Sequence, residues 1–271
     1  MIRVSFQGER GAYSEAAALA YFDEKIETIP LQTFSNVLEN TQNDKSEYSI
    51  LPVENSIEGT VGESIDLLYS TTLNVVGEIY HKIHHCLIGF DSLEKIDTVY
   101  SHPQALGQCR RFIQEHNFKT VPTYDTAGSV KIIKELNKPN ISCIASKQAS
   151  EIFHVPIITD GIADNPNNKT RFLILSKKKA GESKKDKTSI IFSIKHEPGA
   201  LQDIIKNFSN YQINLTKIES RPRKNTSWEY NFYVDFEGNE MNSKIKEMLG
   251  KIQKKTLFLK ILGSYPFAEM N

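Results

Sequence analysis

The sequence lacks a net charge, long apolar runs and a secretory leader. Its 33 basic side chains balance 33 acidic ones, whereas domains that bind nucleic acid usually carry a basic face. Apolar stretches such as Ile190-Ile191-Phe192 are far shorter than the roughly 20 residues that cross a bilayer. The segment from Met1 to Phe6 reads directly as a strand and not as a signal peptide. We therefore expect no nucleic-acid partner and no membrane, and a cytoplasmic location.

The sequence also lacks the side-chain sets that build disulfide frameworks and metal sites. Cys86, Cys109 and Cys143 are odd in number and widely spaced, which favours reduced thiols over disulfides or a zinc site. His84 and His85 lie in a strand-like run, which sends them to opposite faces, and no acidic cluster accompanies them. We expect no metal and no cofactor.

A lysine-rich segment divides the chain. Residues 177–187 read KKKAGESKKDK, with almost no apolar side chains. Such a stretch cannot bury enough surface to offset its ordering entropy, so we expect a solvated linker. The predicted domains are residues 1–176 and 188–271.

The first domain alternates strand-like and helical segments. The strands expected from apolar runs are 2–6, 48–53, 96–100 and 141–145, and the helices are 15–22 (with Ser14 as N-cap), 104–115 and 126–136. This order predicts an α/β sheet with helices on both faces. Residues 73–77 and 84–90 read as long strands or a hairpin and interrupt the alternation. One interpretation is a crossover into a second lobe, with a cleft between two lobes.

The second domain has a simpler order. Strands are expected at 189–195, 213–220, 229–236 and 257–262, and helices at 199–210 and 241–254. The order βαββαβ is the ferredoxin-like arrangement. A small sheet with helices on one face often leaves an edge or face that pairs with a second copy.

Polar motifs stand at four strand ends of the first domain. Glycines mark the turn from Gly8 to Ser14, and the block Glu54-Asn55-Ser56 follows the second strand. Ser101-His102-Pro103-Gln104 and Thr170-Arg171-Phe172 complete the set. Each could be an ordinary capped turn. In open α/β sheets, however, such loops converge on one crevice, so we predict a cleft for a small, polar, carboxylate-bearing ligand.

Two motifs in the second domain are less informative. His196 to Leu201, with Pro198 and Gly199, joins the first strand to the first helix, and Glu219-Ser220-Arg221-Pro222 ends the second strand. From the pattern alone, these are ordinary loops without a function.

These motifs, in this order, resemble those of the monofunctional bacterial prephenate dehydratases with a C-terminal ACT regulatory domain. The most specific elements are Asn168-Lys169-Thr170-Arg171-Phe172, the Glu54-Asn55-Ser56 block with Gly59 and Val61, Ser101 to Ala105, and Glu219 to Pro222. The resemblance implies a catalytic domain similar to type-2 periplasmic binding proteins. It implies conversion of prephenate to phenylpyruvate, water and carbon dioxide in L-phenylalanine biosynthesis, with feedback inhibition by L-phenylalanine.

The resemblance also implies roles for particular residues. Thr170 matches the family's essential threonine, and we expect it to donate a hydrogen bond or a proton to the leaving hydroxyl. His102 or Glu54 would restore that proton. The expected substrate-binding residues are Gly11, Ser14, Asn55, Ser56, Ser101, Gln104, Arg171 and Phe172. Arg171 is expected to clamp a carboxylate with its guanidinium.

The effector site follows from the same resemblance. Gly199, Ala200, Leu201, Glu219, Ser220, Arg221 and Pro222 match the family's phenylalanine-binding loops. Those loops usually lie between two copies, so we expect a homodimer or homotetramer formed through the ACT domains. Glu9, where the family often has proline, and Gln202, where it is often apolar, depart from the pattern.

Three alternatives remain at this point. The chain could be an arogenate dehydratase, which carries out the same elimination on the amino analogue, or a non-catalytic small-molecule binding protein. It could also be bifunctional, with a chorismate mutase. Because a strand begins at Ile2, we do not expect a helical mutase domain.

Overall fold

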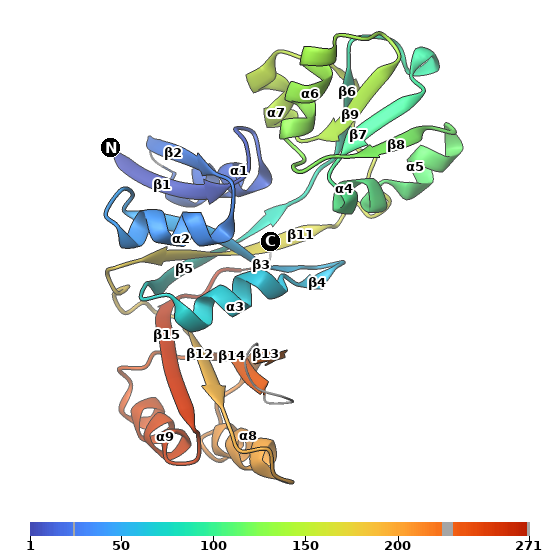
Figure 1. The fold of residues 1–271 in the computed structure, drawn as a ribbon. Coiled ribbons are helices and arrows are strands. Elements are labelled where there is room, and N and C mark those ends of the chain that lie inside the picture. The colour runs from blue at the N-terminus through green and yellow to red at the C-terminus, as the bar shows by residue number, and fades with distance from the viewer. Residues whose placement is uncertain (24, 224–229, 270–271) are drawn as a thin grey trace.

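The computed structural model describes residues 1–23, 25–223 and 230–269 and contains three sheets in this part of the chain. Two of the sheets form separate lobes of the first domain, and the third forms a C-terminal unit below them (Figure 1). No described helix is long and apolar enough to span a membrane. Glu229, with which the third strand of the second domain was expected to begin, lies outside the described residues.

The first lobe is a mixed sheet with strand order β2-β1-β3-β11-β5 and the short β4 paired to β3. Its strands are β1 (Ile2–Gln7), β2 (Ile26–Leu31), β3 (Tyr48–Asn55), β4 (Gly59–Thr60), β5 (Asn74–Lys82) and β11 (Lys169–Ser176). Its helices are α1 (Tyr13–Phe22), α2 (Phe34–Gln42) and α3 (Gly62–Ser70). Strand β11 runs antiparallel to both β3 and β5. Ser14 lies within α1, whose N-cap is Ala12, so the predicted Ser14 cap is wrong.

The second lobe has strand order β10-β6-β9-β7-β8. Its strands are β6 (Cys86–Gly89), β7 (Thr98–Ser101), β8 (Lys119–Pro122), β9 (Ile141–Ala145) and β10 (Ile157–Thr159). Its helices are α4 (Pro103–Gln108), α5 (Arg110–Glu115), α6 (Gly128–Leu136) and α7 (Lys147–Phe153), with a 3₁₀ turn η1 at Leu93–Lys95. The single helix expected over 104–115 is therefore two helices that meet at Cys109.

Two crossings connect the lobes. The chain passes from β5 to β6 through residues 83–85 and returns from β10 to β11 through residues 160–168. β5 and β6 belong to different sheets, so they do not form a hairpin. The interpretation of this stretch as a crossover into a second lobe is confirmed.

The C-terminal unit has the predicted βαββαβ order. It comprises β12 (Asp186–Ser193), α8 (Ala200–Asn210), β13 (Leu215–Pro222), β14 (Tyr230–Glu237), α9 (Ser243–Gln253) and β15 (Phe258–Pro266). The antiparallel strand order β13-β14-β12-β15 gives it ferredoxin-like topology. Both helices cover the face of the sheet turned away from the lobes (Figure 1). We refer to it as the ferredoxin-like unit.

The lysine-rich segment is only partly the solvated linker that its composition predicts. Lys184 and Lys185 are exposed, but Asp186 and Lys187 are buried in β12. The ammonium of Lys187 lies 2.7 Å from the Glu78 carboxylate of β5. Because Lys187 pairs with Glu78, it is buried although Lys184 and Lys185 are exposed. The linker therefore ends at residue 185.

The ferredoxin-like unit packs directly onto the first lobe. One apolar cluster contains Leu173 and Val75 from the first lobe together with Tyr233 and Leu262 from the unit. Gly263 of β15 approaches so closely that a β-carbon there would lie 2.2 Å from the Val75 carbonyl oxygen. The two parts therefore share a core, and β15 of the unit packs closely against β5 of the first lobe.

Candidate active site

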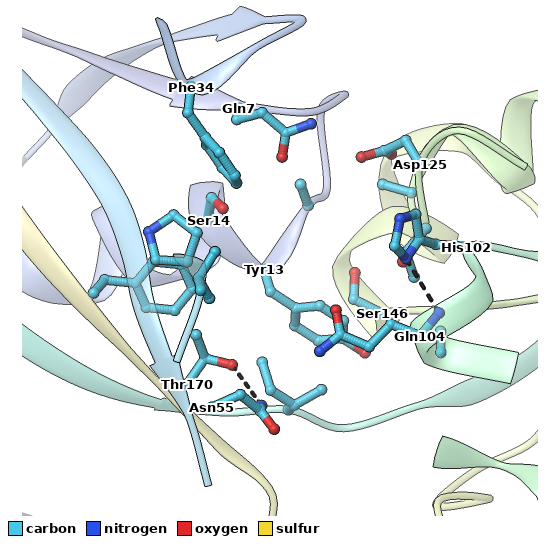
Figure 2. A pocket seen from close by; sticks show the side chains of 18 of the residues that line it. Gln7, Tyr13, Ser14, Phe34, Asn55, His102, Gln104, Asp125, Ser146 and Thr170 are labelled. Carbon is cyan, nitrogen blue, oxygen red and sulfur yellow. Dashed lines mark hydrogen bonds between the residues drawn. The ribbon is translucent and has the colours of Figure 1, made fainter. Parts of the chain in front are cut away.

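A cavity of about 470 Å³ lies between the two lobes. The first lobe contributes the α1 turn with Gly11, Tyr13 and Ser14, and the second lobe contributes His102 and Ser146 among others. Thr170 and Asn55 enter from the neighbouring strands β11 and β3 (Figure 2). The four strand-end motifs predicted to converge therefore each supply side chains to one cavity.

Helix N-termini surround this cavity. Among the described helices, six have an N-cap residue that lines it: Ala12, Thr33, Val61, His102, Ala127 and Ser146. Free N–H groups and the positive end of the helix dipole favour anions at such positions. Within the described chain, neither lysine nor arginine lines the cavity. Side chains already cap the N–H groups of Asn36, Gln104, Gly128 and Ala149. The cavity therefore suits an anion held by the remaining main-chain donors together with neutral polar side chains.

Thr170 is oriented by its neighbour Asn55. The Asn55 side-chain amide donates to the Thr170 Oγ1 atom over 3.0 Å and to Asn168 Oδ1 over 2.7 Å. The side-chain oxygen of Asn55, Oδ1, accepts from the main-chain N–H groups of Ile57 and Glu58, both at 3.0 Å. These two N–H donors determine which end of the amide faces Thr170. The threonine oxygen thus accepts a hydrogen bond, and its own proton remains available to donate into the cavity.

A chain of polar side chains continues from Asn168 into the second lobe. Asn168 donates to Gln108 Oε1 over 3.0 Å, and the same oxygen lies 2.9 Å from His85 Nε2. The oxygen can only accept, so His85 carries its hydrogen on Nε2. Burial lowers the pKa of His85, which keeps the ring neutral. The Tyr13 hydroxyl donates to the His84 carbonyl over 2.6 Å, and its oxygen lies 2.9 Å from His85 Nδ1. This network holds both crossings in one arrangement.

Asp125 is the most buried carboxyl group of the cavity wall. It accepts a hydrogen bond of 2.7 Å from the Gly128 N–H at the start of α6. Burial nevertheless raises the pKa of Asp125 above its ordinary value. Figure 2 shows it in the same part of the wall as His102. A charged Asp125 would repel an anionic ligand, whereas the protonated form could donate to it.

The structure brings together most of the predicted site residues of the first domain. Those that line the cavity are Gly11, Ser14, Asn55, His102, Gln104, Thr170 and Phe172. His102 caps α4 by accepting from the Gln104 N–H over 3.3 Å through Nδ1. Its Nε2 atom is therefore the nitrogen left for chemistry (Figure 2).

Ser56 and Ser101 do not line the cavity. The Ser101 hydroxyl is fully buried and donates to the Ile144 carbonyl over 2.7 Å. Ser56 Oγ accepts from the Lys169 N–H over 3.0 Å, which ties β3 to β11. Both hydroxyls satisfy main-chain groups and do not face a ligand, so their predicted substrate contacts are not supported.

The prediction that Arg171 clamps a substrate carboxylate is wrong. Side chains alternate along a strand, so Arg171 points away from the cavity that Thr170 faces. Its guanidinium is buried and bonds Glu78 at 2.7 Å and Asp235 at 2.5 Å. Glu54 is also displaced from its expected role, because its carboxylate pairs with Lys217 at 2.8 Å and does not line the cavity.

Sequence reasoning missed Tyr13, His85, Gln108 and Asp125. Gln108 lies within a helix, where the pattern gives no reason to single it out, and His85 was weighed only as a metal ligand. Tyr13 and Asp125 do stand at helix starts, and that position could have identified them. Asn168 belongs to a motif recognised in the sequence, but its partners Asn55 and Gln108 are distant in the chain.

One group of potential metal ligands occurs in the described part of the chain. Atoms of His84, Cys86 and Asp160 lie within 4.8 Å of one another, outside the cavity lining. His84 and Asp160 form a pair of 2.5 Å, and the Cys86 thiol donates to the same carboxylate. Because these contacts already satisfy the three side chains, we assign no metal here.

The predicted effector residues lie at two separate places within one chain. Gly199 and Leu201 line a cavity of about 400 Å³ with His196 and Tyr230, and Ala200 begins α8. Glu219 accepts from Thr60 over 2.8 Å, and Arg221 pairs with Asp66 of α3 at 3.1 Å. Pro222 follows in a second cavity of about 310 Å³ against α3, while Ser220 is exposed.

The fold and cavity define a two-lobed α/β protein with a cavity between its lobes and a ferredoxin-like unit beside it. Residues 4–180 match the prephenate dehydratase family. The chain therefore belongs to the prephenate dehydratase family.

Similar proteins support this placement. A prephenate dehydratase of Methanocaldococcus jannaschii is 40% identical over 264 residues, which cover 95% of each chain. A crystal structure of an Arthrobacter aurescens prephenate dehydratase in complex with L-Phe has a TM-score of 0.89 at 27% identity, covering 98% of this chain and 90% of that one. GqqA, described as a quorum quenching acylase, also has a TM-score of 0.89, at 28% identity, covering 98% of each chain.

Proposed function

We propose that this protein is a cytoplasmic prephenate dehydratase. It converts prephenate to phenylpyruvate, water and carbon dioxide in L-phenylalanine biosynthesis. The observation that carries the proposal is Thr170 in the interlobe cavity, with its hydroxyl oxygen fixed by Asn55 and its proton free. Membership of the family supports the choice of substrate.

The reaction needs one proton and no redox partner. The electron pair of the bond to the ring carboxylate moves into the ring as carbon dioxide leaves. The ring becomes aromatic as the para carbon–oxygen bond breaks, and the departing hydroxyl takes up a proton to become water. Thr170 donates to this oxygen as charge develops on it. General acid assistance of this kind is typically worth about 10²–10⁴-fold.

His102 is the better candidate to restore the proton of Thr170. It lines the same cavity, and its Nδ1 atom is engaged by the Gln104 N–H, so Nε2 is the atom that can exchange a proton. Glu54, the alternative expected from the sequence, is engaged by Lys217. No group in the mechanism calls for a metal or an organic cofactor.

The substrate carboxylates are held by helix N-termini. The N-terminal turns of α1 and α4 open onto the cavity, Ser146 reaches it from the N-terminus of α7, and Ser14 and Gln104 add side-chain donors. Main-chain donors in a cavity with restricted access to water stabilise anions more than the same donors would in bulk water. Phe172 lines the cavity and offers an apolar contact for the ring.

We infer that the ferredoxin-like unit is an ACT regulatory domain that binds L-phenylalanine. The prephenate dehydratase of Arthrobacter aurescens, which is similar to this chain over nearly its whole length, was crystallised in complex with L-Phe. The cavity at Gly199 and Leu201 would take the amino acid. Because Glu219 to Pro222 lie elsewhere in the same chain, they would complete this site only from a second copy. A homodimer or homotetramer built through these units follows from that inference.

A coupled comparison tests the proposal. The purified protein is mixed with prephenate or with arogenate, and phenylpyruvate and phenylalanine are quantified, each with and without L-phenylalanine. We expect faster turnover of prephenate and lower rates with L-phenylalanine. Faster turnover of arogenate would reassign the substrate. No turnover of either compound would favour a non-catalytic binding protein. Unchanged rates at saturating L-phenylalanine would remove the regulatory assignment.

A further inference from the structure

A buried ionic network joins the catalytic sheet to the ferredoxin-like unit directly beside Thr170. From Arg171, Nε donates to Glu78 of β5 over 2.7 Å. One terminal nitrogen donates to Asp235 of β14 over 2.5 Å, and the other donates to the Tyr265 hydroxyl over 3.1 Å. All four side chains are at most 3% exposed. One guanidinium therefore bonds to strands of both parts of the molecule.

The centre of the network is balanced in charge, and its edge reaches Glu54, which lies 3.9 Å from Arg171 and pairs with Lys217. Lys187 of β12 donates to the second oxygen of Glu78 over 2.7 Å, and Ser189 donates to the second oxygen of Asp235 over 2.5 Å. Two cations thus meet two carboxylates. Burial disfavours the charged guanidinium, but Asp235, Tyr265, Tyr233 and Glu78 together outweigh it and raise the pKa of Arg171 well above its usual value. A buried charge without its partner would destabilise the folded protein. The positions of Arg171, Glu78 and Asp235 relative to one another are therefore tightly constrained.

The main chain at this point is irregular. β11 and β3 pair in regular register through Thr170 and Arg171, and the register then shifts between Arg171 and Phe172. A bulge breaks the ladder locally and changes the direction of the side chains beside it. On the β3 side, interstrand hydrogen bonds therefore hold the Thr170–Phe172 segment less firmly than a regular ladder would, whereas its pairing with β5 is regular from Lys169 to Ile174. The buried guanidinium adds a side-chain constraint beside the irregular pairing.

We propose that Arg171 is a positioning residue, and that its bonds to Glu78 and Asp235 set the place of the Thr170 hydroxyl in the cavity. The proposal rests on the assignment of Thr170 as the proton donor. The ferredoxin-like unit then contributes Asp235 to the catalytic geometry without reaching the substrate. Any effector that shifts β14 relative to β11 would alter the Thr170 position through this bond.

The expected kinetic effect falls on kcat. Displacement of a reacting group by about 1 Å can cost about 10²-fold in rate. The helix N-termini that hold the carboxylates do not contact this network, so substrate affinity should be retained. A loss in kcat with little change in KM is the pattern for an interaction made only in the transition state.

The test uses Asp235→Asn in the full-length protein. Asparagine keeps the size of the side chain and one acceptor oxygen but removes the charge. We expect kcat for prephenate to fall by about 10–100-fold, with KM within about threefold of wild type. Arg171→Lys keeps the positive charge but loses the planar guanidinium that bonds two carboxylates at once, so it should lower kcat in the same way. Because the two residues act as one unit, the double variant should be little worse than either single variant.

Glu240→Gln is the matched control. It removes a carboxylate from the same unit, where Glu240 pairs with Lys179 at 2.9 Å. We expect kcat within about twofold of wild type. A purely structural role for Asp235 would reduce the folded fraction and leave turnover per folded molecule unchanged, as judged by circular dichroism and active-site titration. That result would overturn the proposal.

Hydrogen–deuterium exchange gives a readout that does not depend on turnover. In Asp235→Asn, the amides of residues 169–172 should exchange at least about tenfold faster than in wild type, whereas Glu240→Gln should match wild type. If wild type fails to convert prephenate but this change in exchange is seen, the proposed function fails and the positioning link stands. Unchanged exchange together with unchanged kcat refutes the link, whatever the substrate.

Discussion

The Asn55 amide donates a hydrogen bond to the Thr170 hydroxyl oxygen over 3.0 Å, and not the reverse. The direction is fixed because the other end of the Asn55 amide accepts from two main-chain N–H groups. A hydroxyl that accepts in this way directs its own proton elsewhere, and here the cavity is the open direction. The hydrogen bond from Asn55 therefore orients the Thr170 hydroxyl, which is a weak acid, so that its proton is directed into the cavity.

Replacement of Thr170 tests the donor itself. In Thr170→Ala the proton is lost, and we expect kcat to fall by at least about 10²-fold. Thr170→Ser keeps the hydroxyl and should keep most of the rate. The release of phenylpyruvate from prephenate, followed by its ultraviolet absorbance, measures both variants. Near-normal turnover by the alanine variant would exclude Thr170 as the donor.

Reversal of the Asn55 hydrogen bond tests the orientation. In Asn55→Asp, the carboxylate would accept from Thr170 and draw its proton away from the substrate, so we expect kcat to fall by about 10²-fold. Asn74→Asp is the control, since Asn74 bonds the Lys177 carbonyl over 3.1 Å at the far end of β5. If both variants have wild-type kcat, the direction of the Asn55 bond is irrelevant to the rate.

Asp125 should make substrate affinity depend on pH. Burial raises its pKa, so the folded protein holds this proton to a higher pH than the unfolded chain does. The contribution of this carboxyl to stability is therefore lost as pH rises through the folded pKa, above the ordinary value of about 3.9. Over the same interval, a negative charge appears in a cavity wall without lysine or arginine among the described residues.

KM for the dianionic substrate should therefore rise as pH increases through this interval. In Asp125→Asn the side chain cannot ionise, and the rise should be absent. Steady-state kinetics of both proteins across the acid range provide the measurement. Parallel pH profiles for the two proteins would show that Asp125 does not control affinity.

Gly263 should be essential for docking of the ferredoxin-like unit. Its φ of +151° is strained for other residues, and an added β-carbon would lie 2.2 Å from the Val75 carbonyl oxygen. We expect Gly263→Ala to lower the free energy of unfolding by about 2 kcal/mol or more, through overpacking and backbone strain. Thermal or urea unfolding measures the change.

Gly250→Ala is the control for that substitution. Gly250 is exposed within α9, and no described atom lies within 4 Å of an added β-carbon. The helix should gain about 0.5–1 kcal/mol from the substitution. If both substitutions changed the free energy of unfolding by the same amount, β15 would be able to move away from β5 without loss of stability.

The sequence by itself determined the local elements and the ends of the strands. The apolar periodicity of the ferredoxin-like unit gave its βαββαβ order, because each element is amphipathic and bounded by turn residues. The motifs of the first domain gave the polar side chains of the cavity, because strand ends of an α/β sheet converge whatever lies between them. The short strand β2, which contains Pro30, and α2 after it carried no comparable pattern and were missed.

Only the tertiary structure decided where the buried charges go. Arg171 stands next to Thr170 in sequence, but strand alternation turns it to the opposite side, where its partners Glu78 and Asp235 are 93 and 64 residues away. Lys187 belongs by composition to a solvated run, yet it pairs with the same Glu78 across 109 residues. An ion is buried only where opposite charges surround it in space, and no local pattern records which distant residues will do so.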